Sequence, residues 1–290
     1  ITYSYSRGVP SDDGFAHFTT RLFPQLAIGR FPVIKTSEIQ ACVNKIIDYE
    51  KNSPFGNWRN RMVLTPDDAF YQGEYRFSEW RMHPQAAYQY SLAMPEHINV
   101  REIFTHEYPF YFEQKTQVAE DILAELNRGA ILFYYLGHGS QNSLTSEAIF
   151  RSFADVPRMD NYERLCVFFS ASCDNGAFTE TNMRCIAEDM MLKSDGGAVA
   201  TLASIFHSSG DSNTSLMLGV SLALFNKDVE PILGNAIISG KTNYGSADNN
   251  SRYALFGDPA MRVNLPHHYY EGDVIPASVQ RKQTVEINWD

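Results

Sequence analysis

Three short runs of the chain are apolar almost throughout, and they constrain the fold more than any other feature of the sequence. They are residues 131–136 (ILFYYL), 165–169 (LCVFF) and 198–202 (AVATL). A strand with one face in water alternates apolar and polar side chains, whereas a strand covered on both faces does not. Amphipathic segments of helical period lie between the runs, which is typical of parallel strands joined by crossover helices. The sequence therefore predicts an α/β fold with a mostly parallel central sheet flanked by helices.

The same patterns predict the individual elements. Strands are expected at residues 26–28, 61–65, 100–104, 131–136, 165–170 and 198–204. Helices are expected at residues 36–51, 113–128, 183–193, 214–225 and 231–241. The first helix would begin with a capping box formed by Ser37 and Gln40, and the second would end at Gly129. Three cysteines are expected as buried free thiols: Cys42, Cys166 and Cys185.

Charge and composition exclude several classes of partner. The chain has 34 acidic and 24 basic residues, a net charge of −10, and no cluster of lysine and arginine. A protein that binds a phosphate backbone carries such a cluster. No apolar run approaches the ~18 residues that a membrane-spanning helix needs. We therefore expect neither nucleic-acid binding nor membrane insertion.

Reactive residues follow two of the central strands at the point where each strand ends. Residues 134–140 (YYLGHGS) place His138 between two glycines, and residues 168–176 (FFSASCDNG) place Cys173 in a tight turn. Carboxyl ends of neighbouring parallel strands meet at one edge of a sheet. If the two strands are neighbours, the sequence predicts a cysteine nucleophile within reach of a histidine base. The alternative is a surface histidine and a buried thiol.

Under the catalytic interpretation, His138 holds Cys173 as a thiolate or takes its proton, and then protonates the leaving amine. The backbone amides of Gly139 and Cys173 would face the oxyanion of an acyl-transfer transition state. Zinc binding is the competing interpretation of a His/Cys pair, but zinc needs three or four ligands, and the chain has no Cys-x-x-Cys or His-x-x-x-His pair. We therefore expect no metal ion and no other cofactor.

Two motifs, YLGHG at residues 135–139 and ASCDNGAF at residues 171–178, resemble the histidine and cysteine motifs of the gingipain family, caspase-like cysteine peptidases of Bacteroidetes. Similar segments occur at residues 28–33 (IGRFPV), 185–188 (CIAE), 196–201 (GGAVAT) and 255–259 (LFGDP). The resemblance implies a caspase-like sandwich and a thiol peptidase acting on proteins or peptides, with Cys173 as nucleophile and His138 as its partner. It also implies export by the type IX secretion system to the medium or the cell surface, with outer-membrane components of that system as partners.

Some members of the family are sortases that transfer secreted proteins to a surface anchor. Residues 174–176 (DNG) stay nearer to the gingipain form, so endopeptidase is the first prediction and sortase the second. A third hypothesis, a non-catalytic binding relative, would be marked by loss of Cys173 or His138, and both are present.

The resemblance also implies an acidic residue that orients the histidine, ahead of the segment matched at residues 12–15. Counting back reaches residues 1–4 (ITYS), which hold no acid. Either the enzyme uses a Cys-His dyad, or the third residue lies upstream. The chain begins with isoleucine, so we expect it to start inside a larger precursor. The peptidase domain is expected at residues 1–265, without its N-terminal portion, and residues 266–290 as a C-terminal extension or the start of another domain.

Two segments are expected to bind the substrate. The end of the third central strand would form one wall of the substrate site, and an extended peptide would pair with its exposed edge. The residues expected there are Ser204, Ile205, Phe206 and His207. The resemblance implies that an aspartate within residues 11–15 (SDDGF) holds an arginine side chain, so Asp12 or Asp13 would favour a basic residue before the scissile bond. The alternative is that the adjacent aspartates only form a turn.

Overall fold

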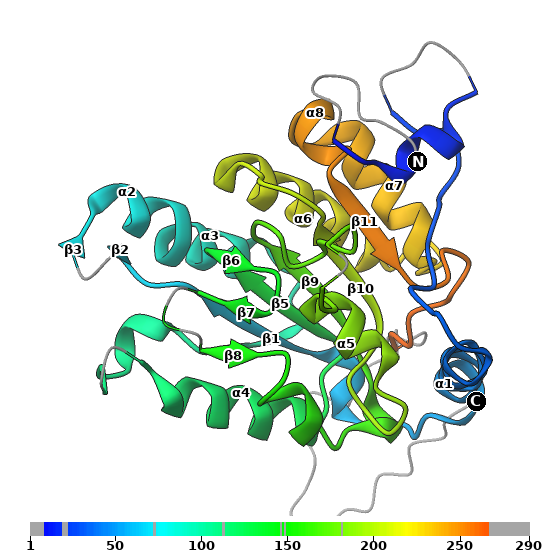
Figure 1. Ribbon diagram of the computed structural model, residues 1–290, viewed down its shortest axis with the longest axis horizontal. Coiled ribbons are helices and arrows are strands. Elements are labelled where there is room, and N and C mark those ends of the chain that lie inside the picture. The colour runs from blue at the N-terminus through cyan, green and yellow to red at the C-terminus, as the bar shows by residue number, and fades with distance from the viewer. Residues whose placement is uncertain are drawn as a thin grey trace, which may run out of the picture.

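The computed structural model describes residues 9–18, 23–71, 74–111, 114–145, 147, 149–180 and 182–266. Its centre is a six-stranded sheet with the order β11-β10-β9-β5-β1-β4 (Figure 1). The strands are β1 (Arg61–Pro66), β4 (Asn99–Glu102), β5 (Leu132–Leu136), β9 (Cys166–Ala171), β10 (Ala198–Ser204) and β11 (Tyr253–Phe256). All neighbouring strands are parallel except β10 and β11, which are antiparallel. The predicted α/β fold with a mostly parallel sheet is confirmed.

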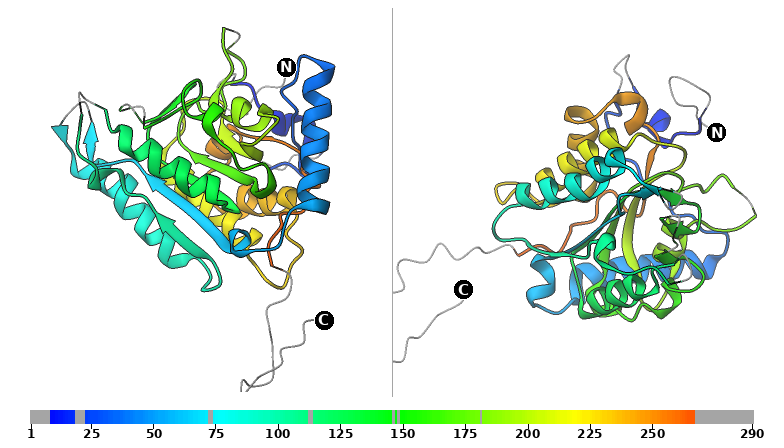
Figure 2. Two further views of the ribbon diagram at one scale, coloured as in Figure 1. Left: turned by 90° about the horizontal axis from the view of Figure 1, so that it is seen from below. Right: turned by 90° about the vertical axis from the view of Figure 1, so that its left-hand side faces the viewer.

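Helices cover both faces of the sheet (Figures 1 and 2). The α-helices are α1 (Thr36–Asn52), α2 (Phe77–Trp80), α3 (Ala86–Ala93), α4 (Thr116–Arg128), α5 (Ile186–Leu192), α6 (Gly210–Leu224), α7 (Leu233–Asn243) and α8 (Ala247–Asn250). Helices α3, α6 and α7 pack on one face, and α4 and α5 pack on the other. All five predicted helices are therefore present, although their ends differ by several residues.

Short elements connect the main ones. Two small antiparallel sheets are formed by β2 (Phe70–Tyr71) with β3 (Glu74–Tyr75), and by β6 (Gly139–Ser140), β7 (Ser143–Leu144) and β8 (Phe150–Arg151). Single helical turns are η1 (Asp12–Ala16), η2 (Asn57–Asn60), η4 (Thr105–Glu107), η5 (Val156–Arg158), η6 (Tyr162–Arg164) and the π-helical η3 (Arg81–Gln85).

The continuous apolarity of the central strands follows from this two-sided packing. On one face, Phe133 of β5 stacks on Phe168 of β9 with ring centroids 5.1 Å apart. On the other face, the ring of Tyr134 packs against the ring of Tyr90 of α3, and the two ring centroids are 4.4 Å apart. Burying a large apolar side chain contributes roughly 1.5–3 kcal/mol, so each strand stabilises two layers of helices at once.

The register of β5 and β9 decides what meets at the carboxyl edge of the sheet. The two strands are parallel neighbours, and their last pair is Leu136 with Ala171. His138 and Cys173 each lie two residues beyond that pair. The condition on which the predicted cysteine–histidine site depended is therefore met.

Some predicted elements are wrong. Residues 26–28 form no strand, and nearby Arg30 makes only an isolated bridge with Phe256. The cap of α1 is not Ser37 with Gln40, because the Glu38 carboxylate accepts the backbone N–H of Lys35 instead (3.2 Å). Strand β11 and the helical segment from α2 to α3 were not predicted at all. Of the extension expected at residues 266–290, only residue 266 lies among the described residues.

The prediction for three of the cysteines is confirmed. Cys42, Cys166 and Cys185 are buried and free, as predicted. Among the described helices, none combines the length and apolarity that a membrane span requires.

Candidate active site

The loop that carries His138 is held rigidly by its own backbone. The His138 N–H donates to the Asp67 carboxylate (3.0 Å), and the His138 carbonyl accepts from the Tyr135 hydroxyl (2.5 Å) and the Thr145 N–H (3.0 Å). A Cβ on Gly137 would lie 2.3 Å from the Cβ of Asp67, so only glycine fits there. The imidazole, about one-third exposed, is thus presented from a fixed main chain.

Glu79 is the acidic partner of His138. Its Oε2 lies 2.9 Å from Nε2 of His138, and the glutamate side chain is buried, with 9% of its surface exposed. A buried carboxylate at this position fixes the orientation of an imidazole and stabilises its protonated form. The structure thus gives His138 an acidic partner within this chain, which neither the dyad interpretation nor the upstream acidic residue had supplied.

Glu79 lies on a helical segment that sequence reasoning missed. Helix α2, the π-turn η3 and α3 run on without a break, although Pro84 lies inside η3. Proline interrupts the ladder of helical hydrogen bonds, and a π-turn accommodates the disruption. The available signal was the spacing of Glu79 and His83, which puts both side chains on one helical face.

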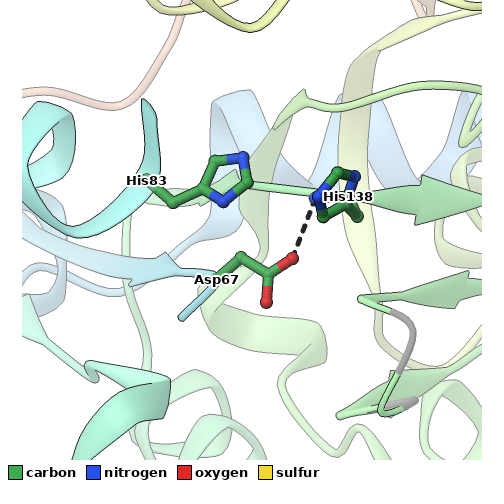
Figure 3. A group of neighbouring side chains, drawn as sticks. All are labelled: Asp67, His83 and His138. Carbon is green, nitrogen blue, oxygen red and sulfur yellow. Dashed lines mark hydrogen bonds between the residues drawn. The ribbon is translucent and has the colours of Figure 1, made fainter. Parts of the chain in front are cut away.

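His83 and Asp67 lie against the same histidine (Figure 3). The His83 ring meets the His138 ring edge to face, with centroids 5.0 Å apart, and His83 Nδ1 is 3.7 Å from Glu79 Oε2. Burial lowers the pKa of His83 to about 4, so it is neutral at pH 7. Burial also raises the pKa of Asp67 well above its usual range. Asp67 follows β1, so the strand-end rule applied to His138 would have found it.

Cys173 contacts the loop after β10. The Ser208 N–H donates to Sγ of Cys173 (3.3 Å), and Sγ donates to the Ser208 carbonyl (3.5 Å). Cys173 is partly exposed, unlike the other three cysteines. Burial raises the pKa of all three of those thiols, which keeps them protonated and unreactive at neutral pH.

Asn175 joins the cysteine loop to the hairpin that follows His138. Its Nδ2 donates to the carbonyls of Ser140 (2.5 Å) and Ser143 (3.2 Å), while its Oδ1 accepts from the hydroxyls of Ser170 (2.6 Å) and Ser172 (2.5 Å). The side chain is fully buried. One amide therefore holds the two reactive loops together.

Gly139 permits the closest approach between these loops. A Cβ at this position would lie 2.6 Å from the Cys173 carbonyl oxygen and 2.7 Å from the Ser172 hydroxyl. The residues expected to form the oxyanion hole, Gly139 and Cys173, are therefore in contact. That their amides bind an oxyanion stays a prediction.

The predicted substrate wall needs correction at two of its four residues. Ser204 and Ile205 are buried, and β10 lies between β9 and β11. The Ser204 carbonyl accepts from Gly176, and the Ile205 N–H donates to a carbonyl beside β11. This edge is therefore already paired and cannot add a peptide strand. Phe206 and His207 are exposed, and His207 Nδ1 lies 3.1 Å from a carboxylate oxygen of Asp174.

The expected role of Asp12 and Asp13 is also corrected. The Asp12 carboxylate receives two hydrogen bonds from the Arg30 guanidinium (2.6 and 2.8 Å). Asp13 accepts from the buried ammonium of Lys241 (2.6 Å). Both carboxylates thus have cation partners within the chain. These ion pairs anchor η1 to the segment before α1 and to α7. Neither is left to hold a basic side chain of a substrate.

Comparison with known proteins agrees with this architecture. The chain matches the model of peptidase family C25 over residues 1–264. No curated protein shows significant sequence similarity to it.

Three solved structures are similar in fold. They are the Arg-specific cysteine proteinase gingipain R, RgpB (20% identity, TM-score 0.67, covering 88% of this chain and 60% of that one), the complex of the Porphyromonas gingivalis RgpB pro- and mature domains (21%, 0.68, 90% and 62%), and a structure described as a protease (16%, 0.67, 94% and 64%). The chain thus spans about three fifths of their length. By its family model and its fold, the chain belongs to peptidase family C25, the gingipain family, with its caspase-like α/β architecture.

Proposed function

We propose that the protein is a cysteine endopeptidase that cleaves peptide bonds through Cys173 and His138. The observation that carries this proposal is the register of β5 and β9, which puts both residues two positions beyond the last strand pair. The contact of Gly139 with the Cys173 carbonyl brings the two loops together. Membership of a peptidase family supports the same reaction.

The reaction begins when the Cys173 thiolate attacks the carbonyl carbon of the scissile bond, forming a C–S bond. Negative charge then moves to the carbonyl oxygen, where the amides of Gly139 and Cys173 would stabilise it. Collapse of this intermediate breaks the C–N bond, and the His138 imidazolium gives its proton to the departing amine. The product of this half-reaction is a thioester.

Water completes the cycle. His138 takes a proton from the water that attacks the thioester, and the Cys173 thiolate leaves as the carboxylic acid forms, which restores the thiolate and the imidazolium. Because Nε2 of His138 forms a hydrogen bond with Glu79, the other ring nitrogen, Nδ1, would exchange protons with Sγ of Cys173 and with the water. Glu79 holds the ring in place and stabilises its positive form during both halves of the reaction.

Recognition of the substrate falls to Phe206 and His207. Both side chains are exposed, and they follow β10 directly, on the way to Ser208, whose backbone contacts the nucleophile. An aromatic ring beside a cysteine nucleophile offers an apolar surface for a peptide side chain. The paired state of Asp12 and Asp13 leaves no support for a preference based on those carboxylates.

The cellular setting follows from the family resemblance. We place the protein outside the cell or at the cell surface, exported by the type IX system and in contact with its outer-membrane components. One related structure is a complex of gingipain pro- and mature domains, and an inhibitory pro-segment would fit a secreted peptidase. No observation favours the sortase alternative.

A peptide library tests the proposal. The purified chain should release fragments that end in free carboxylates, and Cys173→Ala and His138→Ala should abolish their release. His106→Gln, an exposed histidine, is the matched control and should keep full activity. Products joined to an added amine in place of water would indicate a transpeptidase. Hydrolysis that survives Cys173→Ala would overturn the proposal.

A further inference from the structure

Three side chains around His138 are arranged as a possible site for a metal ion. One ring nitrogen each of His83 and His138 and one carboxylate oxygen of Asp67 all lie within 4.8 Å of one another (Figure 3). The three residues come from η3, from the loop after β5 and from the end of β1, so no spacing in the sequence reveals them. The fold, and not a local motif, brings this ligand set together.

One of these residues has a buried polar atom that makes no hydrogen bond in the described part of the chain, and another is a buried carboxyl group. His83 is buried, and its Nδ1 has no hydrogen-bond partner in the described part of the chain. Asp67 is fully buried and accepts the amides of His138 and Asp68, but it forms no ion pair with any lysine or arginine that the structure describes. The neighbouring Asp68, by contrast, is paired with Lys115 (2.6 Å). A buried carboxyl group without a cation nearby and a buried nitrogen without a hydrogen bond are both groups that a bound cation would satisfy.

We propose that Asp67, His83 and His138 form a binding site for a zinc ion that reversibly inhibits the enzyme. Two imidazoles and a carboxylate are a donor set that binds zinc in enzymes, whereas calcium and magnesium prefer oxygen ligands alone. Glu79 is available as a fourth ligand, since its Oε2 lies 2.9 Å from His138 Nε2 and 3.7 Å from His83 Nδ1.

The geometry needs only a modest contraction to bind the ion. Ligand atoms around tetrahedral zinc, at ~2.0–2.2 Å from the metal, stand roughly 3.4 Å apart. The three atoms here lie within 4.8 Å of one another, so side-chain rotations of about an ångström close the site. The His138 main chain stays fixed by its bond to Asp67.

Inhibition follows from the identity of one ligand, and this part of the inference rests on the proposed function. A His138 ring bound to zinc cannot transfer protons to and from the substrate, and Glu79 would bind the ion and no longer stabilise the imidazolium. The ion is therefore an inhibitor and not a cofactor, and a chelator should activate the enzyme and not inactivate it.

Zinc titration of the Cys173→Ala chain tests the site without activity and without the thiol as a competing ligand. Isothermal calorimetry at pH 7.5 should find one zinc ion per chain, with calcium and magnesium unable to displace it. His83→Gln should weaken binding by about tenfold or more. His106→Gln, an exposed histidine, should leave it unchanged. An equal affinity in His83→Gln, or no binding of one equivalent, would overturn the proposal.

Two further readouts keep the test decisive. If His83→Gln fails to fold, ¹⁵N NMR of the Cys173→Ala chain replaces it, since zinc must shift ring nitrogens of two histidines, and the absence of such shifts contradicts the site. In the chain with Cys173 intact, zinc should inhibit peptide hydrolysis, and His83→Gln should raise the zinc concentration needed by about tenfold. Binding without any hydrolysis would contradict the proposed function alone, and hydrolysis without binding would contradict the zinc site alone.

Discussion

Oε2 of Glu79 lies 2.9 Å from Nε2 of His138, although 59 residues separate the two along the chain. The contact is made because α2 runs past the carboxyl edge of the sheet, where the His138 loop emerges from β5. It gives the histidine an acidic partner within this chain.

Glu79→Gln keeps the shape of the side chain and removes its charge. We expect kcat to fall by about 10²-fold with little change in KM, because the carboxylate stabilises the imidazolium in the transition state. Glu74→Gln, an exposed glutamate on β3, is the matched control and should have no effect. Unchanged kcat in Glu79→Gln would reduce the site to a Cys-His dyad.

Asp13→Asn should destabilise the fold without altering specificity. The variant leaves the ammonium of Lys241 buried without its carboxylate, which costs about 3–5 kcal/mol. Asp12→Asn should cost only about 1 kcal/mol, because its partner Arg30 is partly exposed. Chemical denaturation measures both changes. A shift in the residues preferred before the scissile bond, seen in either variant by cleavage profiling, would restore these aspartates as substrate ligands.

Asn175→Ala should separate the two reactive loops. It removes four hydrogen bonds at a fully buried amide, so we expect a loss of at least about 2 kcal/mol in the free energy of unfolding. We also expect kcat to fall in the chains that remain folded, because Gly139 and Cys173 would no longer be held in contact. Asn142→Ala, on the same hairpin, should be nearly neutral. A stable and fully active Asn175→Ala chain would show that this amide does not position the site.

Lys45 should make stability depend on pH. Its ammonium lies inside the fold, donating to the carbonyls of Met191, Lys193 and Gly196, and burial lowers its pKa from 10.5 to about 7. Above pH 7 the unfolded chain therefore keeps a proton that the folded chain has released. The free energy of unfolding should then rise by about 1.4 kcal/mol per pH unit from this group as pH increases from 7 toward 10.5.

The measurement compares urea denaturation of the unmutated chain and Lys45→Met at several values between pH 7 and 9. The difference between their free energies of unfolding should change with pH by about 1.4 kcal/mol per unit. Lys51 is an exposed lysine of the same helix, and Lys51→Met should give no pH-dependent difference. A constant difference for Lys45→Met would mean that the folded chain keeps the proton.

The sequence predicted the parts of the structure that depend on local pattern. The apolar runs predicted β5, β9 and β10, because strands buried on both faces cannot alternate, and the strand-end rule placed His138 and Cys173 at one edge. Strand β11 was missed because its four residues carry too short a pattern and follow a helix on an irregular path.

The rest of the site depends on tertiary contacts that local pattern does not encode. Glu79 and His83 were missed because Pro84 made their segment look unlike a helix, and only the π-turn shows how the helix continues. Asp12 and Asp13 looked available for a substrate, since their partners Arg30 and Lys241 become neighbours only in the fold.

Alkylation of the cysteines tests the central claim most directly. At pH 6 a free thiol, with a pKa near ~8.5, reacts slowly, whereas a thiolate paired with an imidazolium reacts fast. With limiting iodoacetamide, mass spectrometry should find Cys173 labelled well before Cys42, Cys166 and Cys185, which are buried controls within the same chain. His138→Ala should slow the labelling of Cys173 strongly at pH 6 and much less at pH 9. Equal labelling of all four cysteines, or a Cys173 rate that His138→Ala leaves unchanged at pH 6, would contradict the account.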